Sequence, residues 1–97
     1  MQKSKVNPED YVWVVIEIKG TDENFLGLEN DAGERFVPVT ASREDAQALL
    51  DRLPAAPQGT TRQIEATHKK QIAATAAEQE FAVYLVDGQG VLQGRLE

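Results

Sequence analysis

The stretch Tyr11-Val12-Trp13-Val14-Val15-Ile16-Glu17-Ile18 decides the fold, because it carries the strongest β-strand pattern in the chain. One face of such a strand carries only branched aliphatic side chains, those of Val12, Val14, Ile16 and Ile18. The other face carries Tyr11, Trp13 and Val15 before Glu17. Because both faces are largely apolar, the pattern predicts a central strand that is covered on at least part of both sides.

Two shorter strands are predicted to follow as a meander. A polar turn over residues 19–24 precedes a strand over 25–29, and a second turn over 30–33 precedes a strand over 34–39. Pro38 has no backbone N–H to donate to a neighbouring strand. We therefore expect the strand over 34–39 to lie at an edge of the sheet or to end at Pro38.

The next element is predicted to be a helix. Ser42 can cap its N-terminus, and Asp45 three residues later completes a variant of the capping box. Apolar side chains then recur at helical spacing, at Ala46, Leu49, Leu50 and Leu53. Pro54 ends the element, and we expect Leu50 to lie in the core beneath it.

The segment over residues 61–78 has two interpretations. We favour a strand over 61–66 followed by a helix over 68–78, because β-branched residues are frequent in the first part. The alternative is one long helix over 61–78 that begins at a Thr60 cap. A strand over 81–86, a glycine-containing turn and a returning strand over 91–96 predict a closing hairpin.

These elements predict an α+β fold with a five- or six-stranded, mainly antiparallel sheet and two helices mostly on one face. A chain of 97 residues fits one domain. We assign this domain to residues 10–97 and expect residues 1–9 to form a flexible N-terminal arm. Leu96-Glu97 matches the pair that expression vectors leave before a purification tag, so a vector origin and a natural chain end at 95–97 both stay open.

Composition and charge narrow the classes of partner. The formal net charge is −6, and non-specific nucleic-acid binding needs an excess of Lys and Arg, so we expect no nucleic-acid partner. No apolar run approaches the about 20 residues of a membrane span, and no signal peptide is visible, so we expect no membrane association. The chain has no cysteine. We therefore predict a cytoplasmic protein of bacterial type.

No pattern in the sequence predicts catalysis, a metal or a cofactor. His68 is the one histidine in the chain, and neither Ser4 nor Ser42 lies in a nucleophile motif. The acidic residues fall in turns or at a helix start, where turn chemistry and the helix dipole explain them. Gly88 and Gly90 lack the third glycine of a nucleotide fingerprint. We expect the protein not to be an enzyme.

Two sets of residues are candidates for binding. Arg62, His68, Lys69 and Lys70 form a basic cluster that could bind an anionic metabolite or phosphate at the start of a helix. Tyr11 and Trp13 share one strand face, where they belong either to the core or to an interface with a partner. If helices cover the aliphatic face, Trp13 is expected to be partly exposed.

The passage Arg35-Phe36-Val37-Pro38-Val39-Thr40-Ala41-Ser42-Arg43-Glu44-Asp45-Ala46 resembles the strand, proline, turn and acidic helix start of the N-terminal domain of SseB-like proteins. The hairpin around Val86-Asp87-Gly88-Gln89-Gly90 is similar too, whereas the alanine-rich stretch before Phe81 departs from that pattern. These are small bacterial α+β domains, and the resemblance implies a fold more than an activity.

Two functions from different classes remain. The first is a non-catalytic protein-interaction or structural module that binds a protein partner or associates with itself through a sheet edge or face. The second is a small regulatory domain that binds an anion at the basic cluster.

Overall fold

The computed structural model describes residues 10–96 and has the α+β architecture that the sequence predicts. Its two helices and seven strands follow the order β1 (Tyr11–Lys19), β2 (Asp22–Phe25), β3 (Leu28–Glu29), β4 (Arg35–Thr40), α1 (Arg43–Arg52), β5 (Thr60–His68), α2 (Lys69–Glu78), β6 (Ala82–Val86) and β7 (Leu92–Arg95). The arm expected over residues 1–9, and Glu97, lie outside the described residues.

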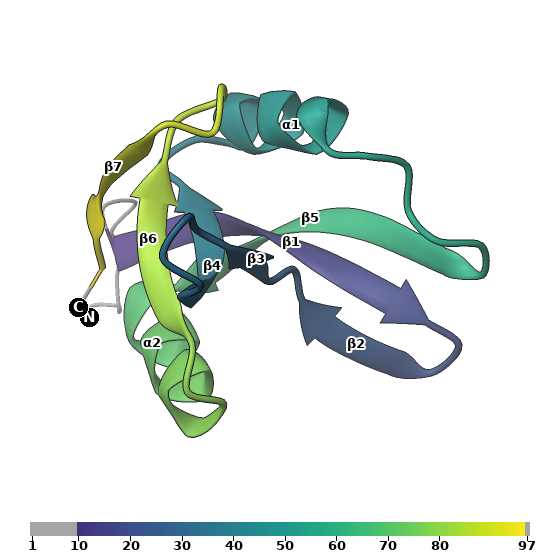
Figure 1. Ribbon diagram of the computed structural model, residues 1–97, viewed down its shortest axis with the longest axis horizontal. Coiled ribbons are helices and arrows are strands. Elements are labelled where there is room, and N and C mark those ends of the chain that lie inside the picture. The colour runs from purple at the N-terminus through teal and green to yellow at the C-terminus, as the bar shows by residue number, and fades with distance from the viewer. Residues whose placement is uncertain (1–9, 97) are drawn as a thin grey trace, which may run out of the picture.

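All seven strands belong to one sheet that is built around β1 (Figure 1). β5 pairs with every residue of β1, from Tyr11 opposite His68 to Lys19 opposite Thr60. The other edge of β1 is shared by β4 at Trp13 and Val14 and by β2 from Ile16 onward. β4 then pairs in parallel with β6, and β6 pairs with β7. The sheet is therefore mainly antiparallel, as predicted.

The structure has seven strands rather than the predicted five or six, because residues 22–24 of the predicted turn over 19–24 are extended and form β2 with Phe25. Of the strand expected over 25–29, only residues 28–29 form a separate strand, β3. β2 continues the β1 hairpin after a turn at Gly20, whose φ of 63° suits glycine. Gly27 then separates β2 from β3. A Cβ atom at Gly27 would lie 2.6 Å from the Phe81 ring, so a larger residue there would force this ring to move.

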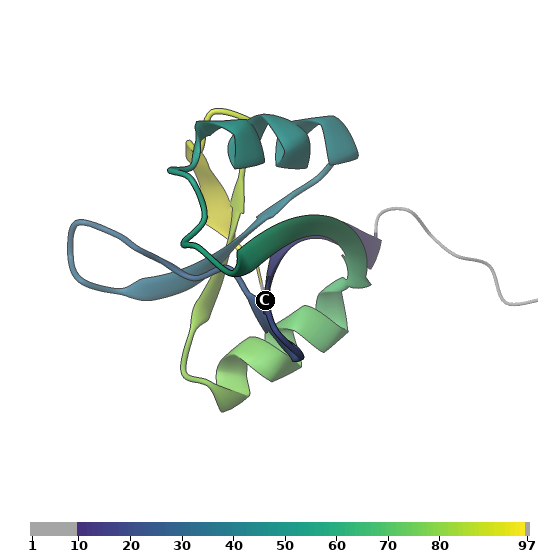
Figure 2. The same cartoon turned by 90° about the vertical axis from the view of Figure 1, so that its right-hand side faces the viewer.

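The helices lie on opposite sides of the sheet rather than mostly on one face (Figures 1 and 2). Ile72 and Ala76 of α2 pack against the aliphatic face of β1 in the main hydrophobic cluster. Val15 points to the other face, where it is 1% exposed. Because β1 is apolar on both faces, each face needs its own cover. The prediction that β1 is a central strand covered on both faces was therefore right. The prediction that both helices lie mostly on one face was wrong.

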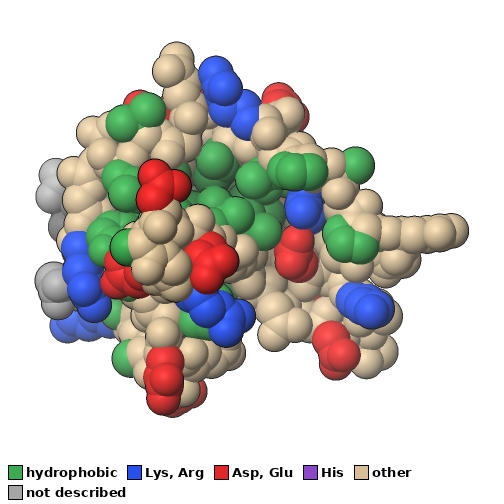
Figure 3. Space-filling view, viewed as in Figure 1, with side chains coloured by type: hydrophobic (Ala, Val, Ile, Leu, Met, Phe, Trp, Pro, Cys, Tyr) green, Lys and Arg blue, Asp and Glu red, His purple; other side chains and the backbone are tan. Residues whose placement is uncertain are grey.

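The side of the sheet beneath α1 is only partly covered. Ala46 and Leu49 of α1 are buried, whereas Leu50 and Leu53 are half-buried. The prediction that Leu50 lies in the core was therefore wrong, and the preceding residue, Leu49, takes that place. Figure 3 shows hydrophobic side chains gathered in a hollow below α1. One short helix thus leaves apolar surface visible on this side.

Pro38 lies in the interior of the sheet, which corrects the expectation of an edge strand. It is buried in β4, between β1 and β6. On the β1 side of β4, β3 pairs only as far as Phe36 and β1 pairs only from Val39 onward. This gap accommodates a residue without an N–H donor.

Candidate functional site

The outer edge of β5 is the longest free strand edge that the structure describes. Within residues 10–96, β5 pairs with β1 alone, and its nine residues run without a register shift. Proteins usually protect such edges with proline, lysine, bulges or short strands. The β5 sequence TTRQIEATH contains neither proline nor lysine. β2 and β7 are only four residues long, and β2 carries Asp22 and Glu23.

The two candidate interface residues lie one strand inside this edge. Tyr11 is opposite His68, and Trp13 is opposite Ala66, so all four side chains share the face that carries α1. The Tyr11 and His68 rings meet edge to face, with centroids 5.2 Å apart. Both Tyr11 and Trp13 are half-buried, so the prediction that Trp13 is partly exposed is confirmed.

Arg62, the first candidate anion ligand, already has partners within the chain. Its Nε donates to Glu17 Oε2 at 3.1 Å on the neighbouring strand. Its Nη1 donates to the Pro54 carbonyl oxygen at 2.6 Å. These contacts fasten the loop after α1 to the β1–β5 ribbon and offset the Arg62 charge with that of Glu17.

His68 serves as a helix cap. Its Nδ1 accepts the backbone N–H of Lys70 at 3.1 Å, at the point where β5 ends and α2 begins. His68 lies six positions after Arg62 along the extended strand, which places their backbones about 20 Å apart. The structure therefore keeps His68, Lys69 and Lys70 together at the start of α2 and places Arg62 far from them.

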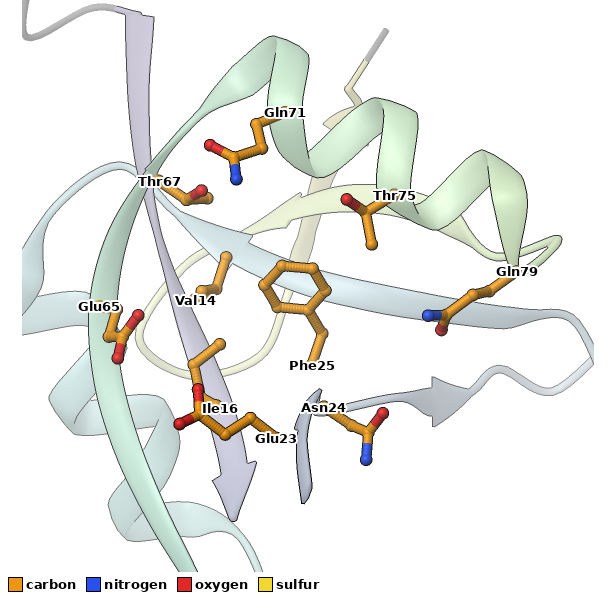
Figure 4. Close-up of a pocket in the computed structure, with 10 residues that line it drawn as sticks. All are labelled: Val14, Ile16, Glu23, Asn24, Phe25, Glu65, Thr67, Gln71, Thr75 and Gln79. Carbon is orange, nitrogen blue, oxygen red and sulfur yellow. The ribbon is translucent and has the colours of Figure 1, made fainter. Parts of the chain in front are cut away.

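A groove that the sequence analysis did not identify lies on the opposite face of the same ribbon (Figure 4). It encloses about 230 Å³ between α2 and the strands β1, β2 and β5. Its lining residues are Val14, Ile16, Glu23, Asn24, Phe25, Glu65, Thr67, Gln71, Thr75 and Gln79. The sequence held one signal for it, because Gln71, Thr75 and Gln79 recur every four residues and form one neutral polar stripe along α2.

Metal and membrane features can be assessed over the described range. Residues 10–96 contain no group of three or more His, Cys, Asp or Glu side chains that could hold a metal ion. None of the helices found there is long and apolar enough to cross a bilayer.

Comparison with known proteins gives no relative for this architecture. No protein-family model, no curated protein and no solved structure matches the chain. The resemblance of residues 35–46 to SseB-like domains therefore stays a prediction.

Proposed function

We propose that this chain is a non-catalytic interaction module of the cytoplasm that forms a homodimer by antiparallel pairing of two β5 edges. The observation that supports this proposal is the free outer edge of β5, nine residues long and without proline or lysine. Strand addition at such an edge satisfies backbone N–H and C=O groups that otherwise bond only to water. A second copy supplies an edge of the same length and twist.

The side chains of β5 favour one register. A two-fold axis perpendicular to the sheet keeps each side chain on its own face, so opposed residues must share a face. Centring the pair on Ile64 places Ile64 opposite the partner subunit's Ile64. Arg62 then faces the partner subunit's Ala66, and Gln63 faces the partner subunit's Glu65. No like charges are opposed, and the central pair is apolar.

Charge distribution within the chain also favours β5 over other surfaces. The formal net charge of −6 repels a second copy in general. β5 itself carries one arginine and one glutamate, so its formal charge is balanced. Tyr11 and Trp13, one strand inside, would flank the contact with half-exposed aromatic surface.

Substitutions at the exposed residue Ala66 test the register. In the proposed dimer, Ala66→Lys places a lysine opposite the partner subunit's Arg62 at two symmetric positions, whereas Ala66→Glu places a carboxylate there. At about 0.2–1 kcal/mol for each cross-strand pair, Ala66→Lys should raise the dimer Kd about two- to thirtyfold. Ala66→Glu should lower it by a similar factor. Sedimentation equilibrium measures both constants.

This design separates a specific contact from the general effect of charge. Ala66→Lys reduces the net negative charge and would by itself promote association, yet the proposed register predicts weaker association. Gln93→Lys on the exposed β7 strand makes the same change in charge away from β5 and should not weaken the dimer. A wild-type chain that stays monomeric to millimolar concentration rules the proposal out. A dimer Kd that is the same for Ala66→Lys and Gln93→Lys also rules it out.

A further inference from the structure

The groove beneath α2 has an apolar floor with an aromatic ring at its centre. The floor is formed by Val14, which is 1% exposed, and Ile16, which is 6% exposed. Both side chains are packed into the hydrophobic core. Figure 4 shows the Phe25 ring in the middle of the groove, between these residues and α2. The β1–β2 register fixes this arrangement, because Phe25 pairs with Ile16. A bound group therefore meets hydrocarbon on one side.

One end of the groove carries two carboxylates from different strands. Glu65 belongs to β5 and Glu23 to β2, and Figure 4 shows the Glu23 side chain directed past Ile16 toward Glu65. Both side chains are exposed, and neither has a hydrogen bond or an ion pair within residues 10–96. No Lys, Arg or His is among the ten residues that line the groove. The local potential therefore favours a cation.

The wall formed by α2 is polar and neutral. In Figure 4 the Thr75 side chain points toward the Phe25 ring, and the Gln71 side chain extends toward Thr67 of β5. Their amide and hydroxyl oxygens can accept hydrogen bonds from an N–H donor. This wall adds no charge, so the two carboxylates alone set the sign of the ligand that the groove favours.

We propose that this groove binds a small primary alkylammonium ion. The ammonium group lies between Glu23 and Glu65, and the alkyl chain lies along Val14, Ile16 and the Phe25 ring. A volume of about 230 Å³ is below the roughly 300–1,000 Å³ of sites for larger ligands, so the occupant is a short chain. A carboxylate or phosphate is repelled by the two glutamates. The groove lies on the face opposite the α1 side, and cation binding there does not require a second copy. Glu65 also belongs to the β5 edge, whereas Glu23 lies outside it and tests the groove alone.

The proposal is tested by amide NMR titration with three five-carbon probes of similar shape. These are n-pentylammonium, 1-pentanol and pentanoate. We expect n-pentylammonium to bind with a Kd on the order of millimolar and to shift signals of the groove residues, including the Gln71 side-chain amide. The alcohol should bind at least about threefold more weakly, and pentanoate should cause no saturable shift.

Glu23→Gln and Glu65→Gln remove one charge each without changing the shape of the side chain. Each should weaken n-pentylammonium binding about three- to tenfold, and the double variant should weaken it by at least about tenfold. Glu44→Gln on α1 makes the same charge change on the other side of the sheet and serves as the matched control. It should leave the Kd within about twofold.

Three results would overturn the proposal. They are equal binding of 1-pentanol and n-pentylammonium, equal weakening by Glu44→Gln and Glu65→Gln, or shifts that do not cluster around the groove. Because all three substitutions are at exposed positions, unchanged melting curves should accompany them. The dimer constant measured on the same samples keeps this outcome separate from that of the β5 proposal.

Discussion

At the scale of single residues, Tyr84 shows how one side chain joins distant parts of the sheet. Its hydroxyl donates to Glu34 Oε1 at 2.9 Å, and Asn30 Nδ2 donates to the same oxygen at 3.1 Å. The Tyr84 ring also meets Phe36 edge to face, with centroids 5.3 Å apart. The turn between β3 and β4 is thereby fastened to β6.

This contact gives a pH dependence whose sign follows from its chemistry. The hydrogen bond to Glu34, with partial desolvation and repulsion by the Glu34 charge, raises the pKa of Tyr84 above its ordinary 10.0, while the Arg95 charge acts in the opposite direction. The folded state thus holds the proton more tightly than the unfolded state. Its contribution to stability is fully present below pH 10 and is lost as the pH rises through the raised pKa.

Phenolate absorbance in a Tyr11→Phe background measures the Tyr84 titration by itself, since the chain has two tyrosines. We expect the midpoint to lie above the ordinary tyrosine value and to fall in Glu34→Gln, which keeps an acceptor oxygen and removes the charge. A Tyr84 midpoint at or below that value, or one unchanged by Glu34→Gln, would show that Glu34 does not control the proton.

At the scale of elements, the C-terminus of α2 holds a non-glycine residue in a left-handed conformation. Glu80 has a φ of 63°. Its N–H donates to the Ala77 carbonyl, and the Phe81 N–H donates to the Ala76 carbonyl at 2.8 Å. These two bonds form a Schellman motif, in which glycine is the preferred residue at the position of Glu80.

Glu80→Gly should therefore stabilise the domain. Removing the Cβ relieves the left-handed strain of about 1–2 kcal/mol, and the greater freedom of glycine in the unfolded chain offsets part of this gain. We expect a net gain of about 0.5–1 kcal/mol, or a rise in Tm of a few degrees. Glu78→Gly, two residues earlier and still helical, should instead cost about 1 kcal/mol. If both variants lower the Tm in thermal melts, the cap does not limit stability.

Local sequence patterns predicted most elements for identifiable physical reasons. The helix start at Ser42 was confirmed, since its Oγ accepts the Asp45 N–H at 3.1 Å. The preferred strand-then-helix interpretation was also confirmed, and His68 marks the boundary as the cap of α2. These features depend on residues within one or two turns of each other, so a single sequence contains their signal.

What could not be predicted depends on long-range pairing. The partner of Arg62 is Glu17, 45 residues away, and no local pattern relates the two. The parallel insertion of β6 beside β4 is equally non-local. Likewise, the stripe of Gln71, Thr75 and Gln79 reads as a solvated helix face until the fold brings Phe25 opposite to it. The groove proposed to bind an alkylammonium ion therefore arises where two such distant segments meet.

At the scale of the whole molecule, one ribbon of β1 and β5 organises both proposed activities. Its aliphatic face supplies the floor of the groove beneath α2, and its other face carries Tyr11 and Trp13 on the α1 side. Its outer edge stays open along all of β5 within the described residues. We infer that this open edge is the main functional feature of the domain.

Hydrogen exchange of the β5 backbone amides, followed by NMR at low and high protein concentration, tests that inference most directly. In an antiparallel pair with β1, alternate residues of β5 direct their N–H groups outward. If two β5 edges pair, those alternate amides between Thr61 and Thr67 exchange more slowly as the concentration rises, while their neighbours, already bonded to β1, change little. Outward amides that exchange equally fast at every concentration would contradict the β5 dimer.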